Sequence, residues 1–175
     1  EVIVQADGYE RKYNDGKSEV FDKKGKLVKL KNKNGYAVSL NYKKGTLVSI
    51  KDSLTKQLFF EWYNDGKVKH IFSAGDKKTF YKYRGNDLVE SKDIAGNVFK
   101  YDYDTNHNMT AINYSDKTKQ SIAYMAKTLF VKEVVSREGN STKYDYGSNP
   151  KNPNNHYWTT VTKVKSGSKN IDVNK

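Results

Sequence analysis

Residues 66–84 read GKVKHIFSAGDKKTFYKYR and contain the pattern of two strands joined by a turn. Val68–Phe72 is apolar, Ser73–Asp76 contains turn-forming residues, and Thr79–Tyr83 alternates so that its two tyrosines share one face. Alternation with a period of two, bounded by Gly and Asp, is typical of a β-hairpin. The next residues repeat the pattern and end in Val98–Tyr103. The stretch is therefore one copy of a repeated hairpin.

The repeat returns about every 21 residues, which is the sequence signature of a stacked architecture. A leucine-type series consists of Leu27, Leu47, Val68, Leu88, Met109 and Phe130. The repeat aromatics, which we expect to be structural, are Tyr42, Phe60, Trp62, Tyr81, Tyr83, Tyr101, Tyr103, Tyr124, Tyr144 and Tyr146. Stacked repeats of this kind usually build scaffolds and extended binding surfaces.

The predicted fold is all-β, a single curled antiparallel sheet of about seven consecutive β-hairpins that is open at both ends. A hydrophobic content of only 35% fits a thin sheet that buries one face and leaves the other in water. We expect one domain over residues 1–175, with an irregular N-terminal cap at 1–21 and regular repeats at 22–147. A loop is expected at 148–156, followed by a C-terminal cap at 157–175.

Composition limits the chemistry. The chain has no cysteine, which excludes disulfides and thiolate metal sites, and it has no apolar run long enough for a transmembrane helix. Its net charge is +12, but arginine supplies only three of the 32 basic residues. Proteins that read nucleic acid rely on arginine for bidentate contacts, so nucleic acid is the less favoured polyanion.

Two segments resemble the YD repeat of bacterial Rhs proteins and animal teneurins. They are Gly96–Asp104, which is followed by Met109–Ile112, and Asn140–Tyr146, with weaker copies at 60–68 and 80–88. The resemblance covers residues 20–147 and implies a spiralling sheet of hairpins with tyrosines on its inner face. In larger members such a sheet closes into a shell that encloses a toxin.

The chain departs from that family in two respects, because it is too short to close a shell and lacks the aspartate- and proline-rich segment used for self-cleavage. Enclosure and autoproteolysis are therefore not carried over. A MORN-like repeat is the alternative, because it also places an aromatic before an Asn-Asp-Gly turn, as in Trp62–Gly66, but its glycine spacing is not kept.

Residues 23–44 contain eight lysines and no acidic residue. An extended strand would place Lys29, Lys31 and Lys33 on one face. The segment predicts a site for polyanions, formed by Lys24, Lys26, Lys29, Lys31, Lys33, Lys43 and Lys44. The alternative is an edge strand that lysines protect against aggregation.

No pattern predicts catalysis, a cofactor or a metal. Residues 102–106 imitate the start of a calcium loop, but its sixth position is His107 and its twelfth is Asn113, so the YD motif explains the letters better. His70, His107 and His156 lie in different repeats and form no paired motif. The aromatics provide ring faces for sugars or bases, although the same spacing describes an ordinary core.

The sequence therefore predicts a non-catalytic, exported bacterial module, located outside the cytoplasm, that binds a protein partner or an anionic surface polymer. Two alternatives stay open: a fragment or reduced relative of an Rhs-type shell, and a basic nuclease or glycan-acting enzyme. The terminal strands of an open sheet also present unpaired backbone groups, so strand addition or self-association is a further expected mode of contact.

Overall fold

The computed structural model describes residues 1–75, 77–154, 157–167 and 171–174, and within them it contains no helix. The described residues therefore include no helix that could cross a membrane. The first eight strands are β1 (Val2–Gln5), β2 (Gly8–Lys12), β3 (Ser18–Asp22), β4 (Leu27–Lys31), β5 (Ala37–Lys43), β6 (Thr46–Asp52), β7 (Gln57–Trp62) and β8 (Val68–Ser73). They are followed by β9 (Phe80–Arg84), β10 (Asp87–Lys92), β11 (Val98–Tyr103), β12 (Met109–Tyr114), β13 (Lys119–Tyr124), β14 (Val131–Val135), β15 (Ser141–Ser148), β16 (Tyr157–Val164) and β17 (Ile171–Asn174).

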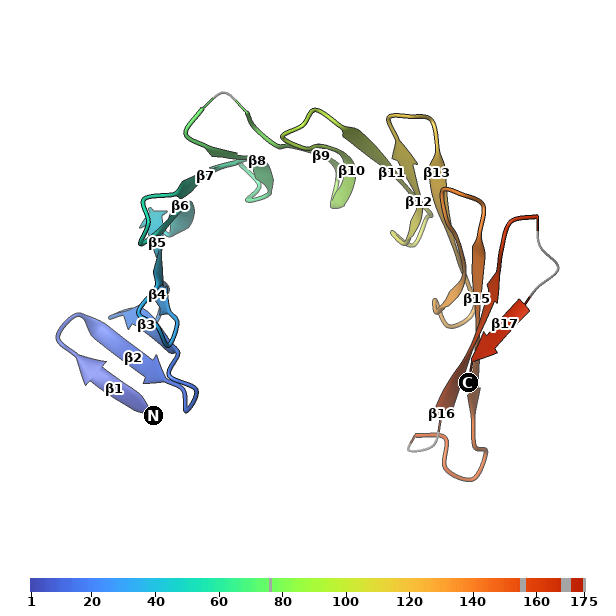
Figure 1. The fold of residues 1–175 in the computed structure, drawn as a ribbon, viewed down its shortest axis with the longest axis horizontal. Coiled ribbons are helices and arrows are strands. Elements are labelled where there is room, and N and C mark those ends of the chain that lie inside the picture. The colour runs from blue at the N-terminus through green and yellow to red at the C-terminus, as the bar shows by residue number, and fades with distance from the viewer. Residues whose placement is uncertain (76, 155–156, 168–170, 175) are drawn as a thin grey trace. The chain divides into compact units, whose positions relative to one another are not determined.

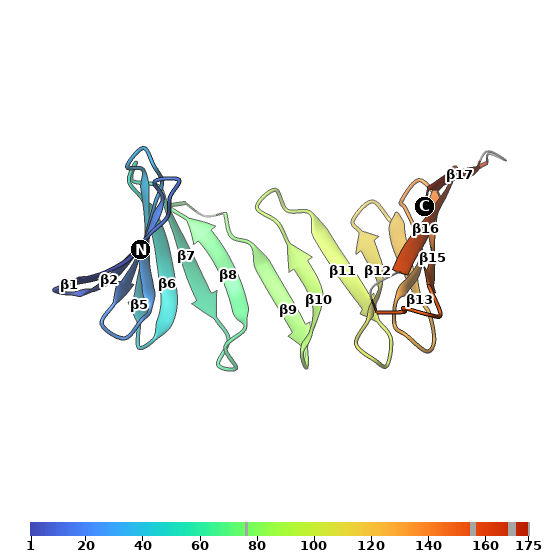
Figure 2. The same cartoon turned by 90° about the horizontal axis from the view of Figure 1, so that it is seen from below.

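Within each of two sheets the strands follow one another in chain order, as Figures 1 and 2 show. This confirms the all-β succession of antiparallel hairpins, but the expected single sheet is divided into one of eight strands, β1–β8, and one of nine, β9–β17. After β8 only an isolated bridge joins Phe72 and Lys78. The Thr79 hydroxyl there accepts from the Ile71 N–H at 2.9 Å and donates to the Ile71 carbonyl at 3.1 Å. The Thr79 N–H also donates to the Ile71 carbonyl at 2.9 Å, so side-chain and backbone bonds to the same residue meet where regular pairing stops.

The chain also forms two compact units where the sequence predicts one domain. The first contains Glu1–Tyr81 and Asp93–Ala95, and the second contains Lys82–Lys92 and Gly96–Lys175. The cut falls at β9, directly after the interruption at Thr79.

The ends of the chain are more regular than the sequence predicts. The expected irregular cap at 1–21 consists of β1, β2 and most of β3, and the β2–β3 ladder pairs every residue from Gly8 to Lys12. At the other end, β15 and β16 are eight-residue strands that flank the expected loop. Residues 155–156 of that loop, and 168–170 and 175 of the expected cap, lie outside the described ranges.

A β-bulge recurs near the start of five strands, namely β4, β6, β8, β12 and β14. In the β5–β6 ladder Tyr42 is opposite Leu47, but Asn41 is opposite Ser49, so Val48 is an extra residue. Because the extra residue restores the pleat, Leu47 and Ile50 face the same side although they are three positions apart. Register shifts of the same kind precede four other aromatics, namely Phe21, Trp62, Tyr103 and Tyr124.

One position of the predicted repeat is corrected by this register. The sequence assigns Phe130 to the leucine-type series, but Val131 is the residue opposite Tyr124. Phe130 precedes β14, and 51% of it is exposed. The turn before β14 is longer than its counterparts, with a hydrogen bond from the Met125 N–H to the Phe130 carbonyl at 2.8 Å. The insertion shifts the series by one residue.

Most hairpin turns share one hydrogen-bonded form. In the turn after β7 the Tyr63 N–H donates to the Lys67 carbonyl at 2.8 Å, and the Gly66 N–H donates to the Tyr63 carbonyl at 3.0 Å. This is a type I turn followed by a residue in the left-handed region, where glycine is favoured. The left-handed residues of such turns include Gly16, Gly25, Gly35, Thr55, Gly66, His107, Lys117 and Gly139.

Candidate functional site

The register collects the repeat aromatics on one face of each sheet, which we call the apolar face. In the first unit Leu40 is opposite Ile50, and Ile50 is opposite Leu58. On β9, Tyr81 and Tyr83 alternate with the exposed Lys82. The remaining repeat aromatics on the apolar face of their own sheet are Tyr42, Phe60, Trp62, Tyr101, Tyr103, Tyr124, Tyr144 and Tyr146.

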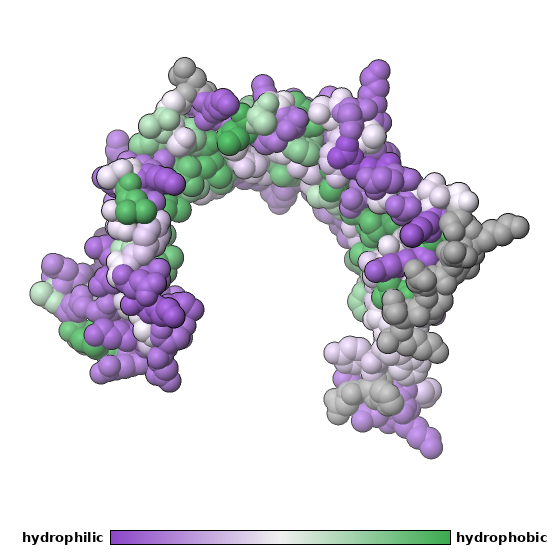
Figure 3. Space-filling view, viewed as in Figure 1, coloured by the Kyte–Doolittle hydropathy of each residue, from purple (hydrophilic) through white to green (hydrophobic). Residues whose placement is uncertain are grey.

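The apolar face has no second layer among the described residues. Only one hydrophobic residue of these is buried, Ala111 at 1% exposure, and no large side chain is fully buried. Leu30 and Leu58, both on the apolar face, are 39% and 46% exposed. Figure 3 shows the result as hydrophobic surface visible between hydrophilic regions. Each sheet is thus a single layer with accessible apolar side chains.

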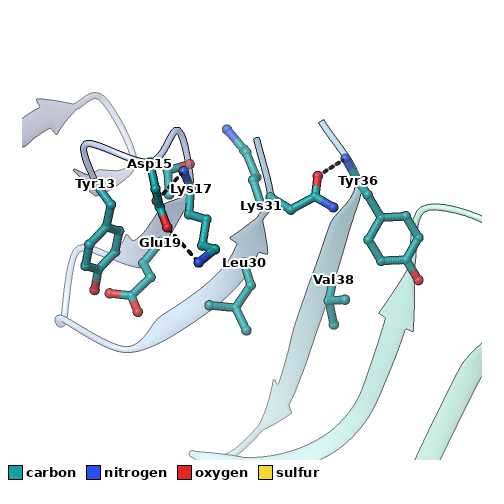
Figure 4. Close-up of a pocket in the computed structure, with 10 residues that line it drawn as sticks. Tyr13, Asp15, Lys17, Glu19, Leu30, Lys31, Tyr36 and Val38 are labelled. Carbon is teal, nitrogen blue, oxygen red and sulfur yellow. Dashed lines mark hydrogen bonds and ion pairs between the residues drawn. The ribbon is translucent and has the colours of Figure 1, made fainter. Parts of the chain in front are cut away.

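In the first unit this face is hollowed into a pocket of about 390 Å³. Leu30 and Val38 lie on its floor, with Tyr13 and Glu19 on one side and Tyr36 on the other (Figure 4). A hydrogen bond to the Glu19 side chain raises the pKa of the Tyr13 hydroxyl. The pocket therefore combines an apolar floor with polar groups at its rim.

A second pocket of about 630 Å³ adjoins the first at Val38, which lines both. Its apolar lining includes Ile50 and Leu58, and its rim includes Asp52, whose carboxylate accepts a hydrogen bond from the Tyr36 hydroxyl at 2.8 Å. We call the two pockets together the apolar groove. It crosses strands β4 to β7 and is lined by Leu30, Val38, Ile50 and Leu58 along its length.

The seven lysines of the predicted polyanion site do not form one strip. Lys24, Lys26, Lys43 and Lys44 lie in or beside the turns that join β3 to β4 and β5 to β6. These two turns touch, because the Lys26 ammonium donates to the Gly45 carbonyl at 2.6 Å.

The other three lysines lie elsewhere. Lys29 and Lys31 are on β4, on the face opposite the apolar one, where the Lys31 ammonium is 3.2 Å from the Glu10 carboxylate. Lys33 does not share their face, since it occupies the β4–β5 turn at the other end of the strands, beside Gly16. The split arises because successive turns alternate between the two ends of a hairpin array.

The acidic residues and histidines have separate roles. The Asp104 carboxylate accepts the Asn106 and Asn108 N–H groups at 2.8 and 3.0 Å, so it closes a turn. Asp102 instead accepts from the Asn113 amide at 2.9 Å. His70 Nδ1 lies 2.9 Å from the Thr79 carbonyl, and His107 Nδ1 lies 3.0 Å from both Asp87 oxygens. The described residues contain no group of three or more potential metal ligands, and His156 lies outside them.

Sequence reasoning did not identify the groove. Tyr13 and Tyr36, which flank it, fall outside the 21-residue series because both belong to turns. The sequence does contain one signal of the bulges that shape this face. Leu27 and Leu30, like Leu47 and Ile50, are three positions apart, and two such residues face the same side of a strand only if a bulge lies between them. Local alternation alone does not show that a face is hollow.

No known family profile and no curated protein matches the chain by sequence. Solved structures do match it. A Tc holotoxin pore of Photorhabdus luminescens is 13% identical over 95% of this chain and 11% of that chain, with a TM-score of 0.55. A complex described as TcdB2-TccC3-Cdc42 is 12% identical over 90% of this chain and 11% of that one, with a TM-score of 0.53.

A third structure, TcdB2-TccC3, is 12% identical and covers 98% of this chain and 12% of the other, with a TM-score of 0.51. The chain thus spans little more than a tenth of the proteins it resembles. At these identities the likeness concerns the fold alone. The chain shares the β-hairpin array of one part of those Tc toxin chains.

Proposed function

We propose that the chain is a non-catalytic β scaffold that binds a polypeptide partner in the apolar groove. The observation that carries the proposal is the groove itself, an accessible apolar floor on a sheet without a second layer. Accessible apolar surface rimmed by polar groups is typical of protein interaction sites. The rim supplies hydroxyls and charges of both signs, which suits a peptide backbone and its side chains.

A peptide-display selection tests this proposal. Peptides selected on the native protein should lose binding to a Leu30→Glu, Leu58→Glu variant, because both side chains are accessible and their charge would be buried under a bound peptide. Ile94→Glu is the matched control, since Ile94 is 60% exposed and lies away from the groove lining. Peptides that bind all three proteins equally would contradict the proposal.

The absence of catalysis is part of the same proposal. Carboxylates such as Asp22, Asp52 and Asp104 are occupied by turn N–H groups, and that supports a structural role for them. The alternatives of a basic nuclease or glycan-acting enzyme predict turnover that is lost when these residues are replaced by asparagine. Hydrolysis of nucleic acid or glycan by the purified protein would support them instead.

A second candidate function is a wall segment of an Rhs-type shell that packs a partner polypeptide for delivery. It is favoured by the match of 90–98% of this chain to a small part of much larger Tc toxin chains. In that case the groove would contact another segment of the same gene product. The assembled protein would act outside the cytoplasm. Sequencing the flanking gene, and crosslinking from position 58 in the full-length product, distinguishes a partner in cis from one in trans.

A further inference from the structure

The two touching turns of the first unit form a second candidate site, which we call the lysine turns, residues 22–26 and 43–46. Lys23, Lys24, Lys43 and Lys44 are exposed there. Lys26 joins the turns through its bond to the Gly45 carbonyl, and its ammonium also lies 4.5 Å from the centre of the Tyr42 ring. Five lysines are opposed by one aspartate, Asp22, whose carboxylate is occupied by N–H groups of its own turn. The site therefore has an excess of four positive charges.

The exposed lysines of these turns have no carboxylate partner among the described residues. Other lysines of the first unit do: the Lys17 and Lys67 ammonium groups are 2.6 Å from Asp15 and Asp65, respectively. Unpaired ammonium groups repel one another, and an anionic ligand relieves that repulsion. What distinguishes the lysine turns is that four exposed ammonium groups without a carboxylate partner are gathered on two turns that touch.

The backbone adds an independent observation. Lys44 has a φ of 49°, and Gly45 has a φ of 85°, in the two-residue turn between the paired residues Lys43 and Thr46. Turns of this type prefer Asn or Gly at both central positions because each has a positive φ. A lysine in the left-handed region is an uncommon choice, and residues held there are enriched at binding sites. Lys44 therefore occupies a turn position whose backbone conformation favours Asn or Gly over lysine.

We propose that the lysine turns bind a linear anionic polysaccharide. Turns at one end of the sheet are separated by two strand spacings, about 10 Å, so an extended chain can contact both. Lysine ammonium groups act as point charges toward carboxylates or sulfates. Nucleic acid fits less well, because the turns contain no arginine, and the Lys26 ammonium already lies over one face of the Tyr42 ring, where a base would stack. This site is separate from the apolar groove.

The experiment measures binding of fluorescent dextran sulfate and polygalacturonate to the whole chain across a salt series, with neutral dextran as a blank. The test variant carries Lys24→Ser, Lys43→Ser and Lys44→Asn. The charge-matched control carries Lys100→Ser, Lys132→Ser and Lys151→Ser, which are exposed lysines of the second unit. The test variant should bind about tenfold more weakly at low salt, and its dependence of log affinity on log salt should be shallower by about two. The control should keep most of the affinity.

Three results would overturn the proposal. The first is no binding of either polyanion at low salt. The second is an equal loss in the test and control variants, which would mean diffuse attraction to the net charge of the whole chain. The third is tighter binding of a single-stranded oligonucleotide than of both polysaccharides. Because Asn is favoured in the turn position of Lys44, reduced binding by the test variant does not reflect unfolding, and an unchanged urea midpoint verifies this.

Discussion

The Tyr124 hydroxyl donates a hydrogen bond of 2.8 Å to the carbonyl oxygen of Met109, 15 residues earlier. The ladder between β12 and β13 begins only at Ala111, so the Met109 carbonyl lies beyond it. The same relation, with the same separation of 15, recurs as Trp62 to Leu47 at 2.7 Å, Tyr103 to Leu88 at 2.9 Å and Tyr146 to Val131 at 2.9 Å. Each aromatic thus satisfies a carbonyl near the start of an earlier strand, and it joins one hairpin to the next.

Removing this hydroxyl should weaken the array. We expect Tyr124→Phe to lower the free energy of unfolding by about 1–2 kcal/mol, because the ring stays in place while the partly buried Met109 carbonyl loses its donor. Tyr9→Phe is the matched control, since Tyr9 is 41% exposed and lies on the same kind of face. Urea unfolding of both variants measures the difference, and equal midpoints for the two would contradict the role of the bond.

The features predicted from sequence are those that depend on neighbouring residues. Alternation in Val98–Tyr103 predicted β11 residue for residue, and the shared face of the tyrosines followed from the same period of two. The sequence of the Tyr13–Lys17 turn is identical to that of Tyr63–Lys67. It appeared irregular because the two copies do not share the same phase of the 21-residue repeat. In the structure both turns have the same hydrogen bonds, but they lie at opposite ends of the strands.

Two features of the structure could not be predicted from the sequence, because both depend on how the strands are arranged. The split of the lysines follows from the alternation of turns between two ends, which separates Lys33 from Lys26 although they are seven positions apart. The division into two sheets falls beside Thr79, whose hydroxyl and N–H group both bond to Ile71. Neither feature has a local signature, because both require knowledge of which strand ends are adjacent.

Backbone strain gives a second prediction. Thr55 has a φ of 75° in the turn after β6, and a β-branched residue is unfavourable in the left-handed region. We expect Thr55→Gly to raise the free energy of unfolding by up to about 1 kcal/mol, with the entropy of glycine in the unfolded chain reducing the gain. Thermal and urea unfolding measure it.

The reciprocal change is its control. Gly66 occupies the same turn position with a φ of 83°, and a Cβ there would meet no atom within 4 Å. Gly66→Thr should therefore destabilise the chain through backbone conformation alone, by about 1–2 kcal/mol. If both substitutions shift stability in the same direction, left-handed strain is not the cause.

Packing gives a third prediction at Ala111, the one buried hydrophobic residue described. Its side chain lies on the face opposite the apolar one, between Asp102 and Ser121 of the neighbouring strands. Ala111→Leu should cost about 1–3 kcal/mol because no space is left for the larger side chain. Ala123 is on the same face but exposed, so Ala123→Leu should cost little. Unfolding midpoints that fall equally in the two variants would refute this account.

The last prediction concerns acid, and it rests on Glu10, which is 7% exposed. The Ser18 hydroxyl donates to its carboxylate at 2.8 Å, and that bond, followed by the one from Lys31 at 3.2 Å, holds the pKa of Glu10 below its ordinary value of 4.5. A carboxyl whose pKa is lower in the folded than in the unfolded state stabilises the fold above the unfolded value. That stabilisation disappears as the pH falls through the folded pKa.

Stability should therefore decline below pH 4.5, and Glu10→Gln should decline less steeply over that interval because it has no proton to take up. Ser18→Ala should raise the pKa of Glu10 toward its ordinary value. Carboxyl-carbon NMR titration reports the pKa, and urea unfolding at several pH values reports the stability. A titration of Glu10 above its ordinary value in the native protein would show that desolvation outweighs the hydrogen bonds, and the predicted sign of the pH dependence would then be reversed.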